Sequence, residues 1–276
     1  MRKLGRQLLA GPYLVWIIGF ILLPIVIILY YAFTNTSGAF TWDNIAAIAD
    51  PVHVKSILLS LKLGFFCTVV CLLLAYPLAM ILNSFHFKHQ SFVVFLFVLP
   101  MWMNFMLRIL AWRLLLSNNG IVNALFGLFG FGPVKMLNTP TAVVFGMVYD
   151  FLPFMILPIY TVLLKLDGAL PEAAADLGAK RHQVFFKVIL PLSMPGIISG
   201  VTMVFLPAMT NYVVLDMVYN STYIMGSLIG SYFNTYDWNN GSMISMVLLF
   251  IIFGITWITG KITGDDGDIQ RGGAAL

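Results

Sequence analysis

Two ionisable residues, Arg108 and Asp150, lie deep inside long apolar stretches of this sequence, where a charge is costly and often functional. A carboxylate at such a depth attracts ammonium groups, and the rings of Tyr149 and Trp102 offer nearby cation–π faces. An arginine and an aspartate at matched depth can also pair and relieve each other's desolvation cost. Two interpretations follow: a structural ion pair, or a station on the path of a cationic solute.

Consecutive helices are predicted to hold these residues. At about 1.5 Å per residue, Arg108 lies about 12 Å below the outer end of the third apolar stretch, and Asp150 about 13 Å below that of the fourth. Helical spacing also places Asn104, Arg108 and Trp112 on one side of the third stretch. Such a polar stripe is not expected to face lipid.

Other polar residues stand near the ends of the apolar stretches. Asn211, Tyr212 and Asp216 end the fifth stretch and would continue a path outward, although Asp216 is equally well explained as a helix-end residue in water. Lys62 and Arg113 lie near the outer ends of their stretches. We expect their long side chains to reach the interface between lipid and water.

The sequence offers no recognisable catalytic or metal-binding set. His86 and His89 have helical spacing but no acidic or cysteine partner nearby, and Cys67 and Cys71 are best interpreted as small packing residues. A phosphate-binding loop G-x4-G-K-[ST] is also missing, since the nearest approach, at 254–261, has five intervening residues. Any ATP that drives this protein must be hydrolysed elsewhere.

The composition indicates an all-α membrane protein. Of 276 residues, 60% are hydrophobic and 9% charged, and the mean hydropathy is +0.94, whereas soluble domains carry about 25% charged residues. The net charge of +4 is too modest to indicate nucleic-acid binding. A span needs about 20 apolar residues. Six stretches qualify: 13–33, 57–82, 92–116, 141–164, 196–215 and 243–262.

The distribution of basic residues predicts the orientation. With six spans both termini lie on one side, and ten Lys and Arg residues fall on that side against two on the other. The ten are Arg2, Lys3, Arg6, Lys88, Lys165, Lys180, Arg181, Lys187, Lys261 and Arg271, and the two are Lys55 and Lys135. Basic residues collect on the cytoplasmic side, so both termini are predicted to be cytoplasmic.

The loop 165–187, between the fourth and fifth stretches, predicts one or two short cytoplasmic helices. Pro171 suits a first helical position, Glu172 follows in the first turn, and Gly178 interrupts the helix. An alanine-rich helix presents little side chain, so another protein could approach its backbone closely. A plain connector lying on the membrane explains the spacing equally well.

One motif in this loop resembles a known pattern. Glu172-Ala173-Ala174 is followed after three residues by Gly178, and after nine more by the sequence Val-Ile-Leu-Pro at 188–191. This resembles the EAA motif of permeases from ATP-driven (ABC) importers, E-A-A-x3-G-x9-I-x-L-P, with Val188 in place of isoleucine. Several fixed positions over 20 residues make a chance match improbable.

The resemblance covers nearly the whole chain and is greatest to the spermidine/putrescine permeases. The segments that carry it are Trp102, Asn104, Leu107, Arg108, 117–123, 152–154, 165–167 and 192–197. It implies one permease domain over 1–276 with the type I importer (MetI-like) fold, in a bacterial cytoplasmic membrane. It also implies a transporter subunit rather than an enzyme.

The same resemblance implies the partners. These are a second homologous permease, two ATPase subunits that bind ATP and Mg²⁺, and an extracytoplasmic polyamine-binding protein. The residues that would couple to the ATPase are Glu172, Ala173, Ala174, Asp176, Gly178 and Ala179. The residues that would line a polyamine path are Trp102, Asn104, Arg108, Tyr149, Asp150, Asn211, Tyr212 and Asp216.

The sequence leaves two alternative functions open. Permeases for sulfate, molybdate, iron and sugars share the EAA loop, so another small solute is one alternative. A carrier driven by an ion gradient is another; it predicts inverted repeats, which the sequence does not display, and would give the EAA loop no purpose.

Overall fold

The computed structural model describes residues 11–84, 95, 97–219 and 223–272 of the chain. Within these ranges the secondary structure is helical, apart from one isolated bridge between Thr34 and Phe40. Five helical segments are long and apolar enough to cross a membrane: Gly11–Ala32, Pro51–Ser84, Pro140–Leu163, Arg181–Thr210 and Trp238–Lys261. The chain is therefore an all-helical protein that crosses the membrane several times, as the composition predicted.

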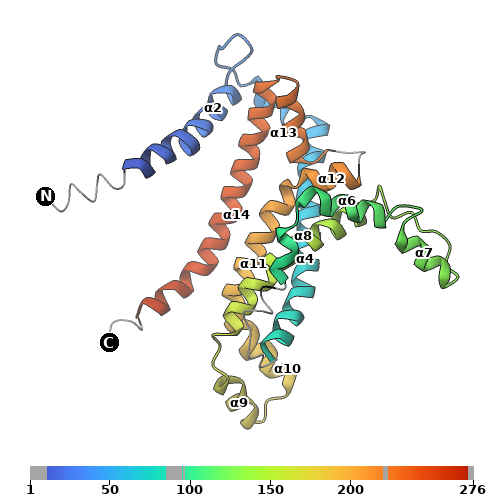
Figure 1. Ribbon diagram of the computed structural model, residues 1–276. Coiled ribbons are helices and arrows are strands. Elements are labelled where there is room, and N and C mark those ends of the chain that lie inside the picture. The colour runs from blue at the N-terminus through green and yellow to red at the C-terminus, as the bar shows by residue number, and fades with distance from the viewer. Residues whose placement is uncertain (1–10, 85–94, 96, 220–222, 273–276) are drawn as a thin grey trace.

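Three long helices form the core: α4 (Pro51–Ser84), α8 (Pro140–Leu163) and α11 (Leu190–Thr210). They pack on one another along most of their length (Figure 1). Small residues on α4 allow this close packing; Cys67, Cys71, Ala75 and Ala79 are all fully buried. Both cysteines belong to the buried core, where small packing residues were predicted.

Glycines bring α11 unusually close to α8. A Cβ atom on Gly196 would lie 2.8 Å from the backbone oxygen of Pro158, and one on Gly200 would lie 2.7 Å from the sulfur of Met155. Small residues spaced by four are a common device for close helix packing in membranes. Pro158, whose ring replaces a backbone N–H, therefore stands at one of the closest approaches between α8 and α11.

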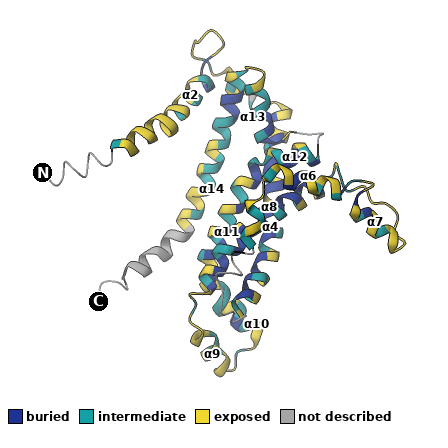
Figure 2. Cartoon of the chain, in the orientation of Figure 1, coloured by how far each residue is buried: buried dark blue, intermediate teal, exposed yellow. Residues whose placement is uncertain are grey.

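Two further helices stand beside the core. The first runs from Gly11 through a π-helical stretch, Ile18–Leu22, into α2 (Leu23–Ala32), and the last is α14 (Trp238–Gly272). They contact each other at one end and diverge toward the chain termini (Figure 1). The first helix is exposed along most of its length, whereas α14 is mainly exposed from Leu249 to Lys261 (Figure 2). The exposed side chains there are largely apolar, so lipid or another subunit must cover them.

Most of the short helices gather at opposite ends of the bundle (Figure 1). At one end lie α3 (Asp43–Ala47), α12 (Tyr212–Val218) and α13 (Met225–Asn234), while α7 (Ile121–Leu128) projects to one side of the bundle (Figure 1). At the other end lie α9 (Ala169–Asp176), α10 (Arg181–Val184) and a π-helical turn, Phe185–Ile189, which continues into α11.

The third predicted span is not one continuous helix. Residues 92–94 and 96 lie outside the described ranges, and the rest forms a 3₁₀ turn, Leu99–Trp102, and then α6 (Phe105–Leu115). The backbone is extended at Met103, and Asn104 caps α6 by accepting hydrogen bonds from the amides of Met106 and Leu107. The sequence analysis missed this N-cap because the surrounding run is uniformly apolar.

Candidate functional site

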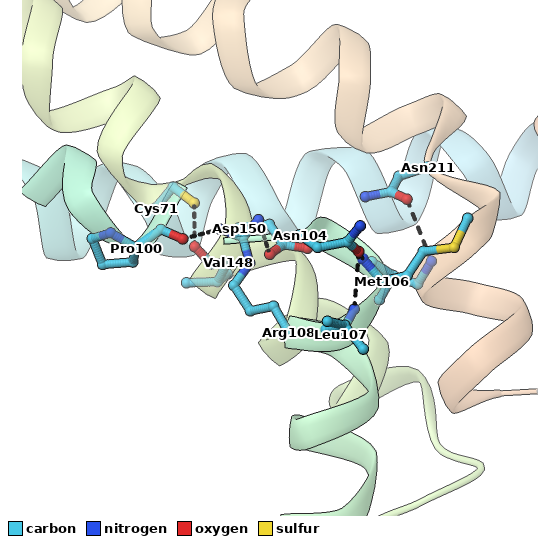
Figure 3. Close-up of polar contacts among 10 residues, drawn as sticks. Cys71, Pro100, Asn104, Met106, Leu107, Arg108, Val148, Asp150 and Asn211 are labelled. Carbon is cyan, nitrogen blue, oxygen red and sulfur yellow. Dashed lines mark hydrogen bonds and ion pairs between the residues drawn. The ribbon is translucent and has the colours of Figure 1, made fainter. Parts of the chain in front are cut away.

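A buried ion pair joins α6 to α8. Nη2 of Arg108 lies 2.8 Å from Oδ1 of Asp150 (Figure 3), and the two residues are 8% and 3% exposed. The matched depths derived from the sequence thus correspond to a real contact. The structural pairing that was one of the two interpretations is formed in this conformation.

The break before α6 supplies a second partner for the arginine. Nη1 of Arg108 donates a hydrogen bond of 3.0 Å to the backbone oxygen of Pro100, in the 3₁₀ turn (Figure 3). That carbonyl also accepts a hydrogen bond from the Met103 amide, and it can accept a second one because no continuous α-helix follows it. The irregular backbone therefore helps to hold a cation at membrane depth.

Aromatic rings surround the guanidinium group. The carbon atom Cζ of Arg108 lies 5.6 Å from the ring centre of Tyr149 and 5.7 Å from that of Phe105, within the range of a cation–π contact. Tyr149 is held in place by Trp112, at 5.1 Å between ring centres. The prediction that Tyr149 offers its face to a cation therefore agrees with the geometry.

Trp102 and Asn104 do not share this environment. Trp102 is 76% exposed and contacts the ring of Phe95. Asn104 is exposed, and its side-chain oxygen is engaged in capping α6. The predicted stripe of Asn104, Arg108 and Trp112 on one helix face is therefore wrong at its first member, which precedes the helix rather than belonging to it.

The ion pair leaves hydrogen-bonding capacity unused. Within the described ranges, Nε of Arg108 and both carboxylate oxygens of Asp150 are buried and form no hydrogen bond, so the 2.8 Å contact at Oδ1 is an ion pair only. An ionised carboxylate accepts several hydrogen bonds, and a bidentate pair with arginine would engage both oxygens. The contact here engages one oxygen, so the carboxylate can accept a second cationic donor.

The predicted outward continuation lies on α12. Asn211 stands where α11 ends and caps the start of α12. Its side-chain oxygen accepts a hydrogen bond of 3.3 Å from the amide of Val214, in the first turn of α12. Tyr212 and Asp216 are exposed on α12, which packs against α6 and α8. The structure thus places these residues on a neighbouring helix but brings none of them into contact with Arg108 or Asp150.

The loop at the opposite end is largely exposed. Helix α9 begins at Ala169, two residues before the predicted start, where Asp167 accepts a hydrogen bond from the Ala169 amide. Gly178 ends the turn after α9 with a φ of +85°, a conformation that side chains disfavour. Glu172, Ala173 and Asp176 are exposed, as is Gly178, while Ala174 and Ala179 are half-buried.

Leu177 is a feature of this loop that the sequence analysis missed. It is 90% exposed, between α9 and Gly178, with no apolar contact to cover it. Its position directly before the predicted helix break was the available signal. An isolated exposed leucine is ordinary. This one, however, lies between Asp176 and Gly178, two of the six residues that were predicted to couple to the ATPase.

The C-terminal side of the loop is fixed to the core. The hydroxyl groups of Tyr76, on α4, and Ser193, on α11, lie 2.8 Å apart, and the Tyr76 ring packs edge-on against Phe185. From Arg181 the helical backbone runs without interruption to Thr210. A displacement of α9 and α10 would therefore be carried into α11.

Among the described residues, no group of acidic, histidine or cysteine side chains is arranged to hold a metal ion.

Comparison with known proteins places the chain among transport components. Residues 69–259 match the family of binding-protein-dependent transport system inner membrane components. The spermidine/putrescine transport system permease protein PotB of Haemophilus influenzae is 38% identical over 247 residues, 86% of each chain. Its namesake from Escherichia coli K12 is 36% identical over 86% of this chain and 90% of its own.

A solved structure shares the fold. One chain of the bacterial alginate ABC transporter, crystallised with an alginate pentasaccharide-bound periplasmic protein, superposes with a TM-score of 0.81. The match covers 95% of this chain and 94% of the other, at 15% sequence identity.

Proposed function

This chain belongs to the family of binding-protein-dependent transport system inner membrane components, and from that premise we propose that it is the permease subunit of an ATP-driven polyamine importer. Similarity to spermidine/putrescine permeases over 86% of the chain supports the substrate class. The observation that carries the proposal is the buried carboxylate of Asp150, with one oxygen unpartnered and an aromatic face beside it. Those are groups that bind an organic ammonium ion.

Arg108 acts in this proposal as a tethered cation. Its guanidinium group occupies the contacts with Asp150, Tyr149 and Pro100 that a substrate ammonium group would take. An arriving ammonium group binds first at the free Oδ2 and then displaces the guanidinium from Oδ1. Asp150 thus remains paired with a cation at every stage.

The exposed loop couples this event to ATP hydrolysis on separate subunits. Glu172, Asp176 and Leu177 present an exposed surface for a groove on an ATPase, and Gly178 sets the turn that follows α9. When the ATPase pair closes, α9 moves, and the continuous helix from Arg181 to Thr210 transmits the displacement to the core. ATP and Mg²⁺ are bound by the ATPases, not by this chain.

The full assembly contains two ATPase subunits, a second homologous permease and an extracytoplasmic polyamine-binding protein. The exposed apolar surface of the described helices supports a second membrane subunit in addition to lipid. The bias of basic residues supports an orientation with α9 and both termini in the cytoplasm.

Uptake of labelled spermidine and putrescine into proteoliposomes, with ATP enclosed with the ATPase subunits, tests the function. We expect ATP-dependent uptake of polyamine that excess unlabelled spermidine abolishes and sulfate does not affect. The Asp150→Asn variant retains the shape of the side chain but leaves Arg108 buried without its counter-ion, so it should lose stability as well as transport. The double variant Arg108→Leu/Asp150→Leu, which buries no charge at the pair, separates the two effects. Competition by sulfate would contradict the proposed substrate class. Transport without ATP would contradict the proposed energy source.

A further inference from the structure

One face of α4 carries a second arrangement without an assigned role. Lys55, Leu59, Lys62, Phe66 and Val70 follow one another at helical spacings of three or four residues, so they form a single stripe. Two adjoining grooves run along this stripe and share Leu59 and Lys62.

The outer groove, of about 440 Å³, contains both lysines. The inner groove, of about 300 Å³, lies between α4 and the beginning of α8 and is mostly apolar. Its lining consists of Leu59, Lys62, Leu63, Phe66, Val70, Pro140, Thr141 and Val144. The combined surface is thus cationic at one end and apolar at the other.

Lys62 and the N-terminus of α8 line the same groove where the two grooves join, and Lys55 lines the outer groove two helical turns away on α4. Lys62 is exposed, and its ammonium group forms no ion pair within the described ranges; the same holds for Lys55. The N-terminus of α8, at Pro140 and Thr141, lines the same groove as Lys62. A 24-residue helix carries partial positive charge at this end, so the junction favours an anion.

The level of this junction in the membrane identifies the anion. Helix α8 spans the bilayer by length and composition, so its first residues mark the boundary between hydrocarbon and headgroups at the end opposite α9. From Lys62 to Val70 the stripe extends about 12 Å into the hydrocarbon, close to the depth of one leaflet, which is about half of 30 Å. An acyl chain fits this length.

We propose that this groove binds an anionic phospholipid of the leaflet opposite α9. Its phosphate lies between Lys62 and the N-terminus of α8, Lys55 approaches the same headgroup from one face of α4, and one acyl chain lies along Phe66 and Val70. Basic residues are scarce at this end of the chain, where the sequence analysis counted only Lys55 and Lys135 outside the spans, so a second lysine beside the groove at position 62 is notable. This proposal is independent of the transported solute.

Native mass spectrometry tests the proposal on the solubilised full chain together with the subunits that copurify with it. The protein is exchanged into phosphatidylglycerol or phosphatidylcholine of identical acyl chains, and retained lipid is counted. We expect one retained phosphatidylglycerol that phosphatidylcholine does not replace. Each basic residue near an anionic lipid contributes about fivefold in affinity, so the double variant Lys55→Gln/Lys62→Gln should bind roughly 25-fold more weakly.

Lys135→Gln is the matched control, because Lys135 is an exposed lysine at the same end of the bundle and lies outside this groove. It should retain the lipid as the unsubstituted protein does. Inorganic phosphate should not displace the lipid, since the acyl chain supplies part of the binding.

Equal retention of the two lipids, or of phosphatidylglycerol by the double variant, would overturn the proposal. So would a cysteine at position 62 that cross-links efficiently to another protein subunit, because the groove would then be a subunit interface.

Discussion

The region around Arg108 and Asp150 and the loop around α9 are opposites in how their polar residues are satisfied. Arg108 and Asp150 are buried and contact each other within the chain. The loop exposes Glu172, Asp176 and Leu177, and neither of the two acidic residues makes an ion pair in the described part of the molecule. The first region can therefore be understood from this chain alone, whereas the second acquires a role only with a partner.

This difference predicts different consequences of substitution. Changes in the buried region should alter the stability of the permease itself, whereas changes in the loop should leave the permease intact and impair its work with other subunits. The substitutions below test that distinction, from the largest expected effect on stability to the smallest.

Replacing Arg108 by Leu should destabilise the protein most. The carboxylate of Asp150 would remain buried without its cation, at a cost of about 3–5 kcal/mol. Thermal unfolding in detergent, followed by circular dichroism, measures the loss. The double variant Arg108→Leu/Asp150→Leu should recover most of the stability, because no charge remains buried. A double variant as unstable as the single one would contradict the account of the pair.

Replacing Gly196 by Ala should have the next largest effect. The added Cβ would lie 2.8 Å from the backbone oxygen of Pro158, so α11 and α8 must separate. Overpacking of this kind costs about 1–3 kcal/mol. Gly254→Ala, on α14, is the control: its Cβ would meet nothing within 4 Å, and its stability should be unchanged or slightly raised. Equal unfolding temperatures for the two variants would disprove the close contact.

Replacing Tyr76 by Phe should cost less. The change removes one hydroxyl from the contact with Ser193, while the Ser193 hydroxyl still donates to the backbone oxygen of Leu190. Loss of one such hydrogen bond destabilises by about 0.5–1.5 kcal/mol. Because this contact fixes the start of α11 to α4, polyamine-stimulated ATP hydrolysis should fall as well. A loss of stability with unaltered stimulation would show that the contact plays no part in coupling.

Replacing Leu177 by Ser should barely change stability. An exposed side chain without contacts contributes within about 0.5 kcal/mol, yet recovery of the ATPase subunits during purification should fall if α9 is their docking surface. Leu128→Ser provides the matched control, since Leu128 is 81% exposed on α7, which projects to one side of the bundle away from α9. If both variants retained the ATPase equally, the assignment of the loop would be wrong.

The sequence predicted more of the helices than of the breaks between them. Helices occupy five of the six predicted stretches because long apolar runs determine them. The break at Met103 and Asn104 was missed, since a proline and an asparagine in an apolar run fit a kinked span equally well. The six-span count itself stays a prediction, because part of the third stretch lies outside the described residues.

The predictions about the site residues were also right where they rested on helical geometry and wrong or missing elsewhere. Depth along consecutive helices was sufficient to predict that Arg108 and Asp150 could meet, and the neighbour of Asp150 in sequence, Tyr149, also faces the cation. The position of Trp102 was predicted wrongly because it depends on the break in the helix at Met103 and Asn104. The spacing of apolar residues does not indicate that break. The exposure of Leu177 and the approach of α11 to α8 at Gly196 are tertiary properties, so they required the structure.

Uptake of labelled spermidine by the Arg108→Leu/Asp150→Leu variant tests the central claim most directly. This variant buries no charge at the pair, so it should fold and assemble, which separates transport from stability. Loss of a charged hydrogen bond of about 1.5–3 kcal/mol predicts ATP-driven uptake roughly 10- to 100-fold lower than that of the unsubstituted protein. Uptake at the unsubstituted rate by the folded, assembled variant would show that the pair is structural and that the polyamine passes elsewhere.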